Sequence, residues 1–543
     1  GAALVLSADG LPACHPDSEG VVAIDSAAAW SSGRLTQMGQ LGRAFLGVTD
    51  KDYTFTGAAL GAAADGVWRL GGSGGAYANA GPQAGSAIGW LRIGSPGLLT
   101  GLGAVYVGSA TNSSMPGYVA VLASQTYTGA TVVSAAYKLA TEMSGGTPFG
   151  QGDVYVLGTL SLQNTNGSLA GADVSRIRLL PGSRLEFLNW FKWGANNYNR
   201  WGDSAPIALD GSTLYFDGQI YAPGSWETVG NVTFDGRAEI RIQHNSSPPA
   251  VLRVASLARA GHGTLSLYGG NYGVDEKLLA ASSPPAVSNG IVAPYIVHAG
   301  YDDFVRYDPT KGFVRMDTSA PNYKTNFAGA GANDIVEVVA PETIAAPVAV
   351  YALKVNSQKN IGGTEMLTIG DGAGPAGLLV KTGPTTIGAP LRFAAGGEAV
   401  VYAGGSSYLS LAGAVEAGSG FTKFGSGSVR LSNNANAILG GVRVNEGILQ
   451  ISAGNGLNAS NTVTLRKQGT LELEVDQVYE GLEGEGAVML GNRTLTVSRR
   501  LAPGGAYHTM SVSESGALRL ASVCVAEFQL AAVGPDCTRP RLA

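Results

Sequence analysis

Charged side chains gather in one short stretch of an otherwise weakly charged sequence, between Tyr301 and Asp317, which includes Asp302, Asp303, Arg306 and Asp308. Carboxylates beside a cation are the groups that cleave acidic polysaccharides, because the carboxylates handle protons and the cation stabilises the developing anion. The same composition is typical of a solvated loop or of a contact between subunits. The sequence leaves these readings open and shows no second carboxylate cluster nearby.

Aromatic side chains are dense between residues 187 and 203. This segment begins at Phe187 and holds three of the seven tryptophans; its candidate contact residues are Trp190, Phe191, Trp193, Tyr198 and Trp201. Such side chains can stack on sugar rings, bind a partner subunit or pack the segment onto the protein body. We expect an interface or packing role ahead of glycan binding.

Other catalytic and metal patterns carry little weight. Gly71–Gly75 fits the nucleophile-elbow pattern and Gly372–Gly377 the dinucleotide pattern, but neither has a strand before it and a helix after it. The five histidines are scattered and form no zinc motif. No cofactor is expected, and calcium has no motif to support it. Cys524 and Cys537 could form a disulfide, which suits an oxidising compartment, or remain separate thiols.

The composition favours a large, turn-rich β protein. Of 543 residues, 80 are glycine, 14% are charged and 45% are hydrophobic. This much glycine opposes long helices, and it lacks the strict period of collagen. The net charge of −5 without a basic block predicts no nucleic-acid partner. No apolar run is long enough for a membrane-spanning helix, and the start at Gly1 suggests a processed chain.

Short alternating runs of apolar and polar residues predict strands throughout the chain. A phrase of glycine followed by a Leu-x-Leu strand recurs at Gly263, Gly427, Gly447, Gly469 and Gly516, and the middle three copies lie 20 and 22 residues apart. A repeat that buries nothing alone but stacks on its neighbours is the signature of a solenoid. With about 22 residues per coil and ~4.8 Å between strands, we expect about 24 coils in a rod of roughly 110 Å.

Residues 415–475 resemble the autotransporter-associated β-strand repeat. The resemblance rests on Phe424–Ser432 and on Gly440–Ile451, which contains Asn445-Glu446-Gly447 before a Leu-x-Leu strand. It implies a right-handed parallel β-helix at a bacterial surface, serving in adhesion or as a structural fibre. The family's membrane barrel is not seen here, which implies a cleaved passenger or a secreted subunit.

The fold predicted is therefore an all-β parallel solenoid with loop insertions and terminal caps. We expect a capping or assembly region over residues 1–120, a solenoid over 121–510 with a protruding insertion near 300–340, and a cap or joint over 511–543. The leading hypothesis is a non-enzymatic extracellular protein that assembles with itself into a filament, fibre or surface layer. The alternatives are a polysaccharide lyase, hydrolase or tailspike-like depolymerase, and an adhesin for glycan or protein.

Overall fold

The structure is a computed structural model. It describes residues 3–6, 14–15, 17–18, 20–24, 35–48, 52–57, 59–73, 89–109, 118–189, 196–219, 223–245, 249–505, 508–513 and 515–528. Regular structure in these residues is almost entirely β-strand, apart from two short 3-10 helices, η2 (Met38–Leu41) and η4 (Val174–Arg176). The strands stack in parallel coils to form a β-solenoid of about 19 turns. The predicted fold class is confirmed.

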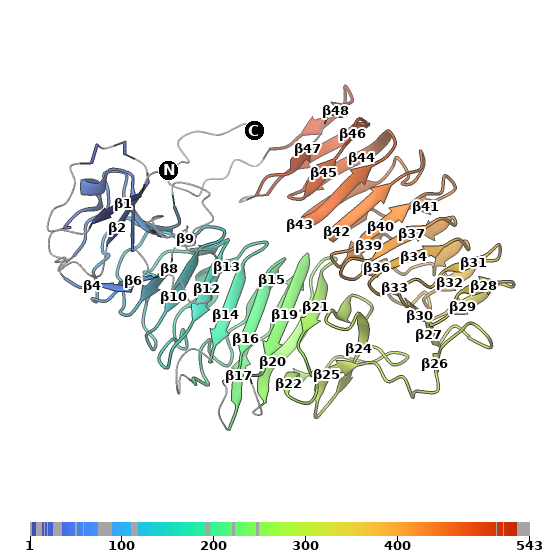
Figure 1. Cartoon of the computed structure of the whole chain (residues 1–543), viewed down its shortest axis with the longest axis horizontal. Coiled ribbons are helices and arrows are strands. Elements are labelled where there is room, and N and C mark those ends of the chain that lie inside the picture. Colours follow the sequence, from blue (N-terminus) through green and yellow to red (C-terminus); the bar gives the residue numbers. More distant parts are fainter. Residues whose placement is uncertain are drawn as a thin grey trace.

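The solenoid consists of two arms (Figure 1). The first arm contains three sheets. The first sheet contains β1 (Ala3–Leu6), β2 (Val21–Ile24), β3 (Phe45–Val48), β5 (Val67–Ser73), β7 (Ala104–Val107), β9 (Thr131–Val133), β11 (Val154–Val156) and β13 (Ile177–Leu179). The second contains β4 (Tyr53–Phe55), β6 (Trp90–Ile93), β8 (Tyr118–Val121), β10 (Lys138–Thr141), β12 (Thr159–Leu162), β14 (Arg184–Leu188), β16 (Thr213–Asp217), β19 (Arg237–Gln243), β21 (Thr264–Tyr268), β23 (Ile296–His298), β24 (Asp303–Asp308) and β25 (Gly312–Arg315). The third contains β15 (Ile207–Asp210), β17 (Ser225–Val229), β18 (Val232–Asp235), β20 (Ala250–Arg259) and β22 (Glu276–Ser283).

The second arm contains two sheets. The larger contains β26 (Tyr323–Lys324), β27 (Ile335–Val338), β28 (Glu342–Ile344), β30 (Ala352–Val355), β31 (Ile361–Gly363), β33 (Ala376–Val380), β34 (Pro384–Ile387), β36 (Ala399–Ala403), β37 (Tyr408–Leu411), β39 (Phe421–Phe424), β40 (Ser428–Leu431), β42 (Val442–Ile451), β43 (Thr462–Leu473), β44 (Gln477–Gly484), β45 (Ala487–Met489), β46 (Thr494–Pro503), β47 (Ser511–Ser513), β48 (Ala517–Leu520) and β49 (Val525–Ala526). The smaller contains β29 (Val348–Val350), β32 (Leu367–Ile369), β35 (Leu391–Phe393), β38 (Val415–Ala417) and β41 (Ala437–Ile438).

Identical positions of successive coils stack inside each arm. In the first arm Leu139, Leu160, Leu185 and Leu214 are register partners in turn. In the second arm Gly447 pairs with Gly469, so two copies of the predicted repeat lie directly on each other. Because side chains alternate across a strand, every second residue enters this apolar column.

The corner at Gly447 explains one glycine of the repeat. Its φ is 72°, and a Cβ there would lie 2.1 Å from Lys423 Nζ. The ammonium is buried and donates hydrogen bonds to the backbone carbonyls of Gly425, Gly427 and Glu446. Burial lowers the pKa of Lys423 to about 7. The lysine therefore adds hydrogen-bond donors to three carbonyls of this corner, one of which, that of Gly427, also accepts the backbone N–H of Ile448.

The two arms meet at a capping hairpin, which consists of β24 and β25. The hairpin pairs antiparallel with β23, the last strand of the first arm. Val305 and Phe313 enter the core of the first arm, whereas Phe304 joins a separate apolar cluster with residues of the second arm. One short element thus covers the end of one arm and binds the side of the other.

Beyond the hairpin the arms run antiparallel, side by side. Residues that come later in the second arm contact residues that come earlier in the first arm. The ion pairs, in order along the second arm, are Asp303 with Lys354, Arg259 with Glu398, Arg237 with Glu446, and Asp210 with Arg466. The single straight rod predicted from the sequence is wrong, because the segment near 300–340 is the turn between two arms. The first arm's strands also continue in parallel across residue 120, without a break in either sheet.

We expect Asp303→Ala to lower the free energy of unfolding by about 3 kcal/mol, because it removes the nearer of two carboxylates that bind the buried Lys354 ammonium, the other being Glu337 at 3.4 Å. Asp303 and Lys354 are 0% and 1% exposed, and their Oδ1 and Nζ atoms lie 2.7 Å apart. Urea denaturation followed by circular dichroism measures the change. Asp303→Leu combined with Lys354→Met should recover part of the loss. Equal stability of wild type and Asp303→Ala would contradict this account of the joint.

Candidate functional site

The charged segment predicted as a possible groove is the capping hairpin itself. Asp303 binds Lys354 and, at 3.0 Å, Arg315. Asp302 accepts hydrogen bonds from the Tyr402 hydroxyl, at 2.9 Å, and from Thr382. Both side chains therefore contact the second arm of the same chain.

The other two predicted residues of this segment also serve the hairpin. Asp308 accepts hydrogen bonds from the Thr310 hydroxyl and from the backbone of Thr310 and Lys311 in the exposed turn, and these bonds lower its pKa to about 2. Arg306 is half-buried on β24, and its Nε has no hydrogen-bond partner among the described residues. The carboxylates point to different partners, so the convergent groove expected around Asp302, Asp303 and Asp308 does not form.

The aromatic segment divides into three parts. Trp190, Phe191 and Trp193 lie outside the described residues. Trp201 is buried against Phe187 in the first arm's core, with ring centroids 6.1 Å apart, so its prediction as a ligand contact is wrong. Tyr198 stacks on Trp226 with centroids 3.8 Å apart and an interplanar angle of 12°. This stack lies at the surface, and Trp226 is 36% exposed.

A buried acid and a buried base hold the segment that carries Tyr198. The Glu227 carboxylate accepts hydrogen bonds from the backbone N–H groups of Arg200 and Trp201, at 2.9 and 3.1 Å from Oε1. The Arg200 guanidinium donates to the carbonyls of Gly167 and Leu188 and to Asn189 Oδ1. Burial raises the pKa of Glu227 to about 7 and lowers that of Arg200 to about 10. These groups fix the aromatic stack in place and do not themselves reach solvent.

Trp226 belongs to an outward-facing set of side chains on three adjacent strands. Its register partners on β20 and β22 are Val251 and Lys277. Two residues further along the strands, Thr228, Arg253 and Leu279 form the next row. The alternating burial of β17, β20 and β22 places both rows on the surface. We call Tyr198, Trp226, Val251, Arg253, Lys277 and Leu279 the aromatic–basic patch.

Sequence reasoning found only Tyr198 of this patch. Trp226 is an isolated tryptophan in an alternating strand, a pattern that gives no sign of a neighbour 28 residues earlier. Arg253 and Lys277 come from two further coils, and only the stacking of the coils brings them together. The sequence does contain one indication. The alternation of apolar and polar residues places Trp226, Arg253 and Lys277 at outward-facing positions of their strands.

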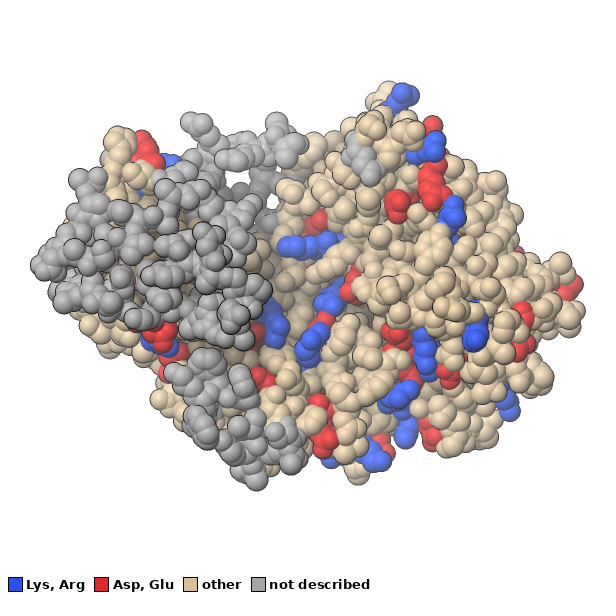
Figure 2. Space-filling view, in the orientation of Figure 1, with Lys and Arg blue, Asp and Glu red and all other residues tan. Residues whose placement is uncertain are grey.

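Charged residues elsewhere on the first arm compensate one another. On the outer face of the sheet that contains β14 and β19, Glu186 binds Lys138 at 2.8 Å and Glu239 binds Arg241 at 3.0 Å. Asp217 differs, because it accepts a hydrogen bond from the neutral Asn245 amide and burial raises its pKa to about 6. Figure 2 shows positive and negative side chains intermixed on the visible face, without a large area of one sign.

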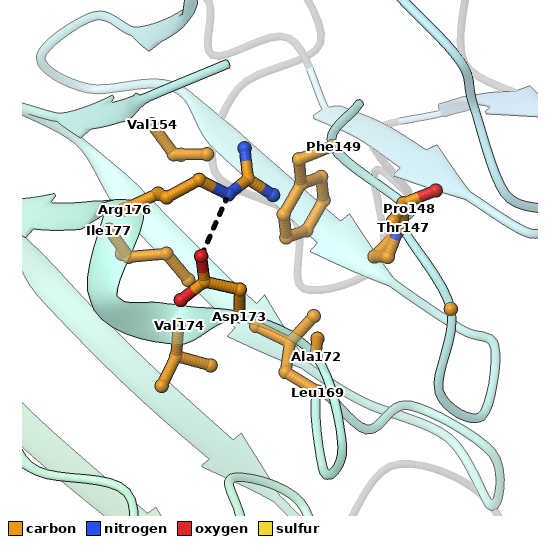
Figure 3. A pocket seen from close by; sticks show the side chains of 11 residues that line it. Thr147, Pro148, Phe149, Val154, Leu169, Ala172, Asp173, Val174, Arg176 and Ile177 are labelled. Atoms are coloured by element: carbon orange, nitrogen blue, oxygen red, sulfur yellow. Dashed lines mark ion pairs between the residues drawn. The ribbon is translucent and has the colours of Figure 1, made fainter. Parts of the chain in front are cut away.

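A small crevice lies between β11 and η4 and has a volume of about 260 Å³, part of which is open to solvent (Figure 3). Phe149, Leu169 and Val174 line it together with Arg176. The guanidinium donates to the carbonyls of Gly150 and Gly152 and lies 3.8 Å from Asp173. The Arg176 guanidinium is thus bonded to backbone carbonyls of the neighbouring turns. The residues that line the crevice provide no pair of groups that could act as nucleophile and base.

The remaining predicted features add no chemistry. Over the described ranges, no group of three or more His, Cys, Asp or Glu side chains could hold a metal ion. His298 is buried at the end of an aliphatic column, where it packs edge-to-face against Tyr272 and at a tilt against Tyr301. Cys524 is half-buried, and Cys537 lies outside the described residues, so the disulfide stays a prediction. None of the helices in the described part of the chain has the length and apolarity to cross a membrane.

Comparisons with known proteins leave the function to be argued from the structure. No family model, no curated protein and no solved structure matches the chain.

We expect Glu227→Gln to change how stability depends on pH. The folded pKa of about 7 lies above the ordinary value of 4.5, so the folded state binds more protons between these values. Relative to Glu227→Gln, the wild type should therefore be most stable near pH 4.5 and should lose that advantage as the pH rises to 7. Urea denaturation of both proteins across this window measures the difference.

Glu227→Ala is the control, because it removes the acceptor of two backbone N–H groups at every pH. It should be less stable than Glu227→Gln throughout the window by about 1–3 kcal/mol. A stability difference between wild type and Glu227→Gln that does not vary with pH would contradict the assignment of Glu227 as a buried titrating group.

Proposed function

We propose that the protein is a non-enzymatic structural solenoid of a bacterial surface that associates with further copies of itself through its last described coil, β47 to β49. The extracellular setting follows from the resemblance of residues 415–475 to the autotransporter-associated repeat. Self-association follows from the exposed apolar columns at this coil, which is the observation that carries the proposal.

The columns of the second arm are buried along its length and become exposed at this coil. Leu471 and Val488 are 0% exposed, whereas their successor Val512 is 44% exposed. Val497 is likewise 0% exposed and its register partner Leu520 is 47% exposed. Among the described residues no strand pairs with the outer edge of this coil. The exposed inward positions leave apolar surface and strand edges that another copy can cover.

The course of the arms bears on the form of the assembly. β1 and β4 are edge strands of the first arm, and β49 is an edge strand of the second. Because the arms are antiparallel, these edges face the same way along the molecule. A filament grows when the two complementary faces of one molecule point in opposite directions, because each added copy leaves a face free. When both faces point the same way, two copies related by a twofold axis cover both faces and the assembly closes. The folded-back course therefore favours a closed pair over the filament predicted from the sequence.

We expect Leu520→Lys to weaken self-association, with a dissociation constant raised about tenfold or more, because a charge would enter the apolar contact. Light scattering after size-exclusion chromatography measures the mass over a range of concentrations, and electron microscopy separates closed pairs from filaments.

Leu439→Lys is the matched control, since Leu439 is 45% exposed but lies at the side of the second arm, beside β41. It should associate as the wild type does. A wild type that stays monomeric at high concentration would overturn the proposal, and so would equal loss in the two variants.

A further inference from the structure

We propose that the aromatic–basic patch of the first arm binds carboxylated sugars, such as uronate or sialate residues of an acidic polysaccharide. This inference is independent of self-association, because β17, β20 and β22 belong to the first arm and the proposed contact between copies uses β47 to β49 of the second arm. Glycan binding was an alternative for the aromatic segment 187–203, and of that segment's candidate residues only Tyr198 belongs to the patch proposed here.

The stacked pair supplies the apolar part of the site. Tyr198 covers one face of the Trp226 indole, and Trp226 remains 36% exposed. Aromatic rings that keep an exposed surface offer an apolar platform with polar tips, and the C–H face of a sugar ring packs on such a platform. Val251 lies between Trp226 and Lys277 in one row, and Leu279 lies beside Arg253 in the next row, on the side away from β17. Both are half-buried and extend the apolar surface around the cations.

Arg253 and Lys277 supply the positive charge. Neither side chain forms a salt bridge with a described residue, whereas Arg184, Arg241, Arg259 and Arg315 each lie over a tyrosine ring and also bind a carboxylate. Cations therefore lie beside aromatic rings in several places, but at those four places the cation is paired with a carboxylate of the protein. At this patch the two cations are free to bind a carboxylate of a ligand, a role that suits guanidinium and ammonium groups.

The register fixes the dimensions of the patch. Lys277 lies two strands from Trp226, which is about 10 Å at the usual strand spacing. Arg253 lies one strand and two residues from Trp226 and is closer to the ring. A ring stacked on Trp226 thus places the carboxylate of the same or the next sugar within reach of a cation. A flat sheet surface with these groups suits an extended chain of sugars better than a small enclosed ligand.

Rigid support favours binding at this place. The Tyr198 segment is held by the Glu227 and Arg200 hydrogen bonds, and Trp226 is on the same strand as Glu227. The platform is therefore formed before a ligand arrives, so little conformational entropy is lost on binding.

Isothermal titration of the full chain tests the proposal with four probes. They are a hexamer of galacturonate, the same hexamer with its carboxyls methyl-esterified, sialyllactose and lactose. We expect at least one acidic probe to bind and its neutral counterpart to bind about tenfold more weakly, and we expect added salt to weaken the acidic complex. The two acidic arms distinguish uronate from sialate as the preferred sugar.

Variants assign the binding to the patch. Trp226→Ala and the double variant Arg253→Ala/Lys277→Ala should each weaken the acidic probe about tenfold, and Trp226→Phe should retain part of the affinity. Tyr408→Ala is the matched control, because Tyr408 is 37% exposed on β37 of the second arm. Circular dichroism checks that each variant is folded. Binding of neither acidic probe, equal binding of acidic and neutral probes, or equal loss in Tyr408→Ala would overturn the proposal.

Discussion

The fold depends on how the open end of the first arm is covered. A stack of parallel coils ends in an exposed apolar core and a row of unpaired backbone groups, and both must be covered or paired. The capping hairpin does this with three consecutive residues of one strand: Val305 enters the first arm, while Asp303 and Phe304 bind the second. The same strand therefore covers the end of the first arm and attaches the second arm to it. The side-by-side packing that follows, from Arg259 to Arg466, relies on that attachment.

The solenoid could be predicted from the sequence, but its folding back could not. Glycine before a Leu-x-Leu strand repeats locally, and Gly447 and Gly469 do stack in register as that pattern requires. The turn between the arms depends on pairs such as Asp303 with Lys354, which lie 51 residues apart and leave no periodic signal. A charged segment in a weakly charged chain suggested a solvated loop, a contact between subunits or a reacting groove, whereas Asp303 is buried in an ion pair with the second arm and Asp308 lies in an exposed turn.

Buried polar groups in this protein hold corners and segments rather than reacting groups. Lys423 binds three carbonyls at one turn, and Arg200 with Glu227 holds the segment before β15. In each case burial moves the pKa toward neutrality, because the charged form loses water while the fold supplies hydrogen bonds. Shifted pKa values are common at catalytic sites, but Lys423, Arg200 and Glu227 each have backbone partners that account for their positions.

The antiparallel arms also determine how the molecule would respond to force. In a single straight solenoid, tension between the two ends would pass through every interface between coils in series. Here the coils of β1 and β49 lie at the same end of the paired arms, so tension between them pulls the arms apart. The contacts would then break one after another, beginning at Asp210 and Arg466 and ending at Asp303 and Lys354. The joint between the arms would carry load only after the outer contacts had opened, and the coils themselves would stay intact.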